Sequence, residues 1–196
     1  MPDEVRDPRS RMVYSAVQLV RERGVTATGI RDVVEHASAP RGSFQHYFPG
    51  GKDQLVSEAV LWAGDFAAQS VTGYADTARR PTPSGLFAHM VKQWKRELTA
   101  RDFQRGCPVM ATAADLVAAD TAVTEPLRTA MAHWQDAVTG ELTRMGVPAR
   151  RSRRLATVML STLEGAIMLA RIQRNVRPLS TVVADLAPLL DDAVVR

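Results

Sequence analysis

Apolar residues recur along this chain with the period of an α-helix. Val13, Ala16, Val17 and Val20 stand at positions i, i+3, i+4 and i+7, which is the spacing of one helix face. Gly24 follows them, at a place where a glycine commonly ends a helix. The sequence contains no extended alternation of apolar and polar residues of the kind that marks a half-buried strand. The pattern therefore predicts an all-α fold.

Two shorter helices are expected next. Thr28 is expected to cap a helix whose buried face carries Val33 and Val34. Pro40 is expected to open a third helix that ends at Tyr47, because proline is favoured in the first turn. Further helices are expected at about residues 52–73, 86–100, 106–118, 127–145, 151–175 and 180–195. The total is about nine helices.

The predicted elements fall into two domains. Residues 1–55 form a three-helix N-terminal domain with a helix-turn-helix, and residues 56–196 form a larger helical domain. The segment 155–170 is apolar on most sides, so we expect the helix that contains it to be buried all round.

Composition narrows the class of protein. Of 196 residues, 45% are apolar and 23% are charged, as in ordinary globular proteins. A net charge of +4 permits a polyanionic partner without identifying one. Cys107 is the single cysteine, which excludes an intrachain disulfide and a cysteine-pair metal site and fits a reducing cytoplasm. Because neither a secretory signal nor a long apolar run is found, we expect no membrane span.

The first three helices have the spacing of a helix-turn-helix, whose third helix enters the DNA major groove. Phe44 and Phe48, one turn apart, are expected to anchor that helix and leave its polar residues free. An arginine can contact guanine, a glutamine can contact adenine, and serine or tyrosine can contact phosphate. Spacing alone supports a second interpretation equally well, in which these residues are only the polar surface of a small helical bundle.

The residues of this segment also resemble a known family. Thr28-x-Ile30-x-x-Val33-Val34-x-x-Ala37, Gly42-Ser43-Phe44-x-x-Tyr47-Phe48 and Lys52-Asp53-x-Leu55 are similar to the N-terminal domain of TetR-type repressors. The segments 39–44, 48–52 and 105–114 resemble the LmrA/YxaF-like branch of that family. Two positions depart from the common pattern, since Ser38 stands where glycine is usual and Pro40 stands where a small polar residue is usual.

The resemblance implies a function and partners. Such proteins are homodimers that bind a near-palindromic operator in double-stranded DNA, and a small molecule bound by the C-terminal domain changes the spacing of the two DNA-binding domains. The residues matched to DNA-contacting positions are Thr28, Arg41, Gly42, Ser43, Gln45, His46, Tyr47 and Lys52. A repressor that is released from DNA by a small, largely apolar molecule is therefore expected.

A ligand cavity in a helical domain is lined by aromatic and flexible apolar side chains with a few polar groups. The candidates are Trp62, Phe66, Met90, Trp94, Met110, Trp134, Met159 and Leu163. Ordinary core packing is the alternative for every one of them.

Candidate dimer contacts lie on the last two predicted helices, which are long and apolar. Glu164 is costly in such a stretch unless it is paired, so it either binds a polar ligand or pairs with an arginine such as Arg171 of a second subunit. The candidates for this interface are Glu164, Gly165, Ala166, Val183, Leu186 and Leu190.

The remaining chemistry is sparse. Cys107 is either a redox sensor or a packed cysteine. His89 and His133 lack acidic or cysteine neighbours at metal-ligand spacing, so no metal and no cofactor is expected. The basic run at residues 150–154 is interpreted as a solvated helix start. Because no nucleophile–base pair or phosphate loop is found, an enzyme is disfavoured. The remaining alternative is a helical protein-interaction module or a ligand-binding protein without sequence-specific DNA binding.

Overall fold

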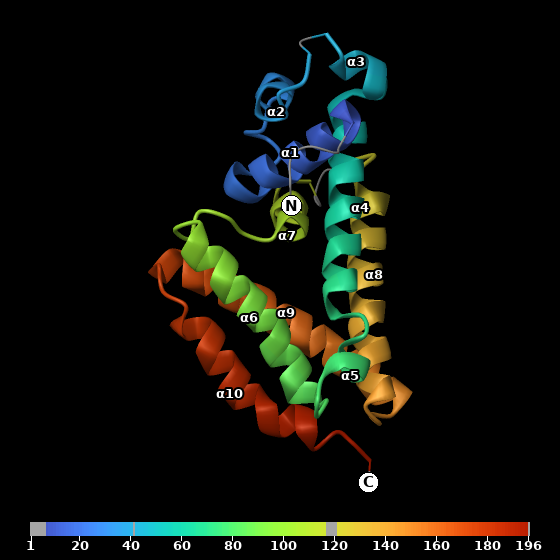
Figure 1. Ribbon diagram of the computed structural model, residues 1–196, viewed down its shortest axis with the longest axis vertical. Helices are drawn as coiled ribbons and strands as arrows, with labels where there is room; N and C mark the ends of the chain where they lie inside the picture. Colours follow the sequence, from blue (N-terminus) through green and yellow to red (C-terminus); the bar gives the residue numbers. More distant parts are fainter. Residues whose placement is uncertain (1–6, 41, 117–120, 196) are drawn as a thin grey trace. The chain divides into compact units, whose positions relative to one another are not determined.

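A computed structural model describes residues 7–40, 42–116 and 121–195, and within these ranges every regular element is a helix (Figure 1). The all-α prediction is confirmed. The chain divides into two compact units, which are described separately. Residues 1–64 with 107–131 form the first unit, and residues 65–106 with 132–196 form the second. The helices α4 and α8 each contribute to both units.

The helices follow one another along the chain in ten elements within the described residues. They are α1 (Pro8–Arg23), α2 (Ile30–His36), α3 (Phe44–Tyr47), α4 (Gly51–Val71), α5 (Tyr74–Thr77), α6 (Pro83–Ala100), α7 (Pro108–Leu116), α8 (Thr124–Arg144), α9 (Ala149–Gln173) and α10 (Arg177–Asp191). The sequence pattern does not predict α5, because four residues are too few to show a period.

The first unit has a core made by the inner faces of α1 to α4. Met12, Val33, Phe48 and Leu55 are at most 1% exposed and belong to one apolar cluster with Phe44. The rings of Phe44 and Phe48 are stacked with centroids 5.3 Å apart. The two phenylalanines therefore anchor the short helix α3, as their spacing predicts.

In the second unit, α6, α9 and α10 lie side by side (Figure 1). The inner side of α9 is buried at Met159, Leu163 and Ile167, whereas Met168 and Ile172 on the outer side are 53% and 72% exposed. In a single copy of the chain, α9 is therefore not buried all round, contrary to the expectation. Hydropathy along the sequence reports that a helix is apolar, but not whether its own chain supplies enough neighbours to cover it.

Two further details of the fold differ from expectation. The last helix begins at Arg177 rather than Ser180, and Pro178 lies in its first turn instead of preceding it. This is consistent with the general tolerance of proline at the first helical positions.

By length and apolar composition α9 is the one helix in the described residues that could cross a membrane, although 44% of its most apolar window is buried inside the structure.

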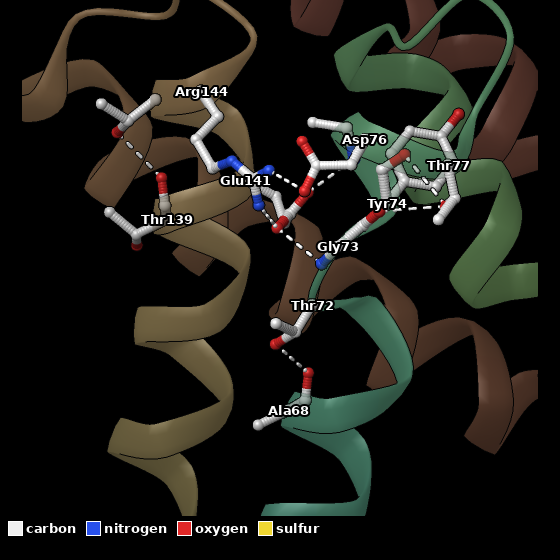
Figure 2. A network of polar contacts seen from close by, with 11 residues as sticks. Ala68, Thr72, Gly73, Tyr74, Asp76, Thr77, Thr139, Glu141 and Arg144 are labelled. Atoms are coloured by element: carbon white, nitrogen blue, oxygen red, sulfur yellow. Dashed lines mark hydrogen bonds and ion pairs between the residues drawn. The ribbon is translucent and has the colours of Figure 1, made fainter.

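A buried carboxylate fixes the short helix α5 in the second unit. Glu141 on α8 is 2% exposed and accepts hydrogen bonds from the backbone N–H groups of Gly73 (2.9 Å) and Ala75 (2.7 Å). Arg144 donates to the same carboxylate at 2.8 Å and also pairs with Asp76 (Figure 2). The Asp76 hydrogen bond is the main cause that raises the pKa of Arg144. Glu141 thus satisfies the free amides at the start of α5.

Replacement of Glu141 by alanine is expected to lower the free energy of unfolding by about 1.5–3 kcal/mol, the range for hydrogen bonds to a charged group. The backbone amides of Gly73 and Ala75 would lose their acceptor in a half-buried setting. Urea unfolding followed by circular dichroism measures this change. The matched control is Glu125→Ala, since the surface pair of Glu125 with Arg128 should contribute less than about 1 kcal/mol. Equal effects of the two substitutions would contradict the assigned role of Glu141.

Candidate nucleic-acid interface

The turn between α2 and α3 begins with a strained residue. Ser38 has a φ of 48°, in the left-handed region that glycine adopts most readily. The turn is held by backbone bonds from Ser38 N to Glu35 O (3.0 Å) and from Ala39 N to Val34 O (3.0 Å). Arg11 on α1 donates through Nε to Ala37 O at 3.0 Å. Ser38, which departs from the family's usual glycine, therefore keeps a glycine-like conformation.

Replacement of Ser38 by glycine is expected to raise the free energy of unfolding by about 0.5–1 kcal/mol, because relief of the left-handed strain outweighs the added freedom of the unfolded chain. Thermal unfolding of the two proteins provides the comparison. Ala39→Gly is the matched control, since Ala39 is not among the described residues with positive φ and should lose about 0.5–1 kcal/mol. A Ser38→Gly protein that is destabilised as much as the Ala39→Gly control would show that the backbone of Ser38 is not strained.

The start of α3 differs from the predicted one. Ser43 precedes the first helical residue, Phe44, and its hydroxyl donates to Pro40 O at 2.8 Å. The backbone N–H of Ser43 also donates to Pro40 O, at 3.0 Å. Pro40 therefore begins a turn that leads into the helix rather than the helix itself. Its carbonyl, not its ring, provides the local anchor.

The predicted DNA-contacting residues of α3 lie on its outer side. Gln45 and His46 are exposed, whereas Tyr47 is half-buried against the core cluster. The His46 and Tyr47 rings meet edge to face at 5.0 Å. Gly42 is exposed, and a Cβ atom placed there would meet nothing within 4 Å. Gly42, Gln45 and His46 are therefore exposed to solvent, and Arg41 lies outside the described residues.

Thr28 occupies a different position from the one expected. It is 3% exposed, and its hydroxyl donates to Gly24 O at 2.6 Å. The residue that precedes α2 is Gly29, and Asp32 reaches back to accept from Gly29 N at 3.2 Å. The prediction that Thr28 caps α2 is wrong, because its side chain instead closes the loop after α1. This burial supports a structural role for Thr28 and leaves its hydroxyl little surface for DNA.

Lys52 lies in the first turn of α4, where free backbone amides favour an anion. It is half-buried, and the preceding Gly51 has a φ of 74°. Gln54 accepts from Gly50 N at 2.9 Å and donates to Glu58 at 3.0 Å. The loop after α3 is therefore fixed by side chains of α4, close in sequence to Lys52.

Two supporting residues are absent from the candidates that the sequence suggests. Arg11 holds the end of α2 through its bond to Ala37 O, and nothing in its spacing indicates this contact between residues far apart in the chain. Asp32 could have been found, because an acidic residue three positions after a helix-capping residue is the spacing of a capping box. Asp32 also pairs with Arg23 at 2.6 Å.

The eight predicted ligand-binding residues are distributed over both units. Trp62 and Met110 belong to the first unit, and the other six belong to the second. Phe66 is 57% exposed, whereas Met90, Trp134, Met159 and Leu163 are buried. Trp94 is half-buried. The second unit has a hollow of about 300 Å³, but none of the eight predicted residues lines it. The residues that line it are Ser70, Val71, Thr72, Tyr74, Thr77, Ala78 and His89.

The six predicted dimer residues differ in exposure. Gly165 is exposed, and Glu164, Val183 and Leu186 are half-buried. Ala166 and Leu190 are at most 2% exposed, so their side chains pack inside their own unit instead of facing a partner. The helix period indicated that these two residues lie near the predicted dimer interface, but it did not show that they lie on the inner sides of α9 and α10.

The remaining candidate groups have ordinary surroundings. Cys107 is buried and is not part of a disulfide. Arg171 donates to the carbonyls of Phe103 and Gln104 at 3.3 and 3.0 Å. His133 lies 2.8 Å from Asp65, a neighbour that sequence spacing did not reveal. Among the described residues no group of three or more His, Cys, Asp or Glu side chains could hold a metal ion.

Comparisons with known proteins agree with this geometry. Residues 14–59 match the model of the bacterial regulatory proteins of the tetR family, and residues 83–185 match the model of the LmrA/YxaF-like C-terminal domain of transcriptional regulators. The HTH-type transcriptional regulator Rv0196 of Mycobacterium tuberculosis is 38% identical, with 93% of this chain and 94% of that protein covered. YxaF of Bacillus subtilis is 30% identical, with 94% and 95% covered.

Solved structures show the same fold. NemR of E. coli superposes with a TM-score of 0.77 over 96% of this chain and 100% of that chain, at 18% identity. A TetR transcriptional regulator from Legionella pneumophila gives 0.78 over 95% and 99%, at 17% identity. Members of the matched family are transcriptional regulators and not enzymes. The chain belongs to the TetR family of bacterial transcriptional regulators, in its LmrA/YxaF-like branch.

Proposed function

We propose that this regulator is a cytoplasmic repressor that binds a near-palindromic operator as a homodimer and is released by a small, largely apolar molecule. The observation that carries the DNA-binding part is the exposed outer side of α3, where Gln45 and His46 face solvent while Phe44 and Phe48 fix the helix from below. A helix held in this way can enter a major groove and keep its polar side chains free for base edges.

The support for a homodimer is an uncovered apolar surface on the second unit. The exposed side of α9 carries Val158, Met168, Leu169 and Ile172, and Leu189 on α10 is 46% exposed. Gly165 lies on the same helix, and a Cβ atom there would meet nothing within 4 Å. A contiguous apolar surface usually marks an interface, and two helices per subunit suit an isologous four-helix contact.

The support for a small-molecule effector is a buried polar atom. Trp134 is 4% exposed, and its indole Nε1–H has no hydrogen-bond partner among the described residues. A buried donor without an acceptor is costly. An apolar effector that carries a hydrogen-bond acceptor would satisfy it, which adds one polar group to the largely apolar ligand expected from the sequence.

A duplex that carries the operator, labelled at one end, tests repression and release. The protein should bind it with a dissociation constant that rises steeply with salt, because phosphate contacts release counterions. A panel of apolar carbonyl compounds should include at least one that releases the DNA from wild-type protein but not from Trp134→Phe protein. If compounds release both proteins equally, Trp134 has no part in effector binding; if none does, the regulator is constitutive.

A further inference from the structure

Asp115, near the end of α7, contacts the loop that joins α1 to α2. Its Oδ2 atom accepts a hydrogen bond of 3.0 Å from the backbone N–H of Thr26, 89 residues away in sequence. The same atom lies 2.7 Å from the point where a Cβ atom would stand at Gly24. Gly24 has a φ of 81°, so a side chain there would be excluded both by the backbone and by this carboxylate. All three residues belong to the first unit.

The loop held by Asp115 leads directly into the helix-turn-helix. Thr28 donates to Gly24 O at 2.6 Å through its hydroxyl and to Val25 O at 3.1 Å through its backbone. Gly29 then precedes α2, whose Val33 and Val34 pack in one cluster with Phe44 of α3. A displacement at Thr26 would therefore reach α2, and α2 would carry it to α3.

The negative charge of the Asp115 carboxylate is in an electrostatically unfavourable place. The carboxylate lies beside Gly24, the residue that ends α1, and helix C-termini carry partial negative charge. Arg23, the nearest arginine in sequence to Gly24, is paired with Asp32. The backbone N–H of Thr26 is the donor that the structure places against this carboxylate, so the acceptor oxygen of Asp115 is the feature that matters for the loop.

We propose that Asp115 is a positioning residue for operator recognition: it holds the α1–α2 loop so that α2 and α3 keep the arrangement that enters the groove. This inference rests on the proposed function. Asp115 does not itself touch DNA, and it acts through Thr26.

Three substitutions at Asp115 separate positioning from folding. Asp115→Asn keeps an acceptor oxygen at the same distance, Asp115→Ala removes it, and Asp115→Glu keeps the charge but must push against the loop near Gly24. The control is Asp136→Ala on the surface of α8. Each full-length protein is tested for operator affinity, for affinity to a random duplex, for hydrogen exchange at the Thr26 amide, and for its unfolding midpoint.

The Ala and Glu variants should bind the operator about tenfold more weakly, with unchanged affinity for the random duplex and faster exchange at Thr26. The Asn and Asp136→Ala variants should behave as wild type. Wild-type operator affinity in both the Ala and the Glu variants would overturn the inference, as would a loss of operator affinity in the Asn variant that matches the Ala variant. If the Ala variant fails to fold, the Glu and Asn variants decide. If wild-type protein prefers no duplex sequence, the proposed function itself fails, which is a different result.

Discussion

Replacement of Arg41 and Gln45 by alanine is expected to weaken operator binding by about 10²–10³-fold, because each bidentate contact to a base edge contributes about 1–3 kcal/mol of discrimination. Gln45 is exposed on α3, and its side-chain amide donates a long hydrogen bond of 3.3 Å to Pro49 O. This amide can therefore turn to a base at little cost. Fluorescence anisotropy with an operator duplex and with a random duplex measures the effect, which should be much larger for the operator.

The control for this pair is Arg80→Ala with Gln69→Ala, which removes the same two residue types at exposed positions of the second unit. That variant should bind the operator within about threefold of wild type, as is usual for changes away from base contacts. Wild-type operator affinity in the Arg41 and Gln45 variant, with the protein folded and its mass unchanged, would show that α3 is not the recognition helix.

Replacement of Met168 and Ile172 by glutamate is expected to raise the dimer dissociation constant by about 10³-fold or more, since an interfacial charge without a partner costs several kcal/mol. Both side chains are more than half exposed in a single copy, so the substitution should leave each subunit folded. Analytical ultracentrifugation over a range of concentrations gives the dissociation constant.

Gln69→Glu with Thr99→Glu adds the same charge at exposed polar positions of α4 and α6 and provides the control for dimerisation. It should remain dimeric at the concentrations that dissociate the Met168 and Ile172 variant. A dimer of unchanged strength in that variant would place the subunit interface elsewhere, and the exposed side of α9 would then need another partner.

The helix period along the sequence predicted most of the fold and the two phenylalanines that anchor α3. Phe44 and Phe48 stand one turn apart between polar neighbours, and the structure buries both. Hydrophobic periodicity is a local signal that survives folding because every helix must bury one face. The ends of helices were less predictable. Gly29 precedes α2 and Ser43 precedes α3, because the hydroxyl of Thr28 donates to Gly24 O and Pro40 lies in the turn that the Ser43 hydroxyl closes.

Contacts between distant segments could not be predicted from a single sequence. The bond of Asp115 to Thr26 joins residues 89 positions apart, and the bonds of Glu141 to Gly73 and Ala75 span 68 and 66 positions.

The exposure of a side chain on a helix also depends on which other helices pack against it. Phe66 and Ile172 are apolar and stand at helical spacing, yet both are more than half exposed, because nothing in their residue type specifies which helix lies opposite.

Selection of bound sequences from a pool of random duplex DNA is the sharpest test of sequence-specific binding through α3. The full-length protein is incubated with the pool at moderate salt, bound duplexes are amplified over several rounds, and the enriched sequences are aligned. We expect one near-palindromic sequence, with half-sites spaced by about one helical turn or a multiple of it, and loss of the enrichment with Arg41→Ala and Gln45→Ala protein. A pool that stays random, or enrichment that survives this double substitution, would refute recognition through α3.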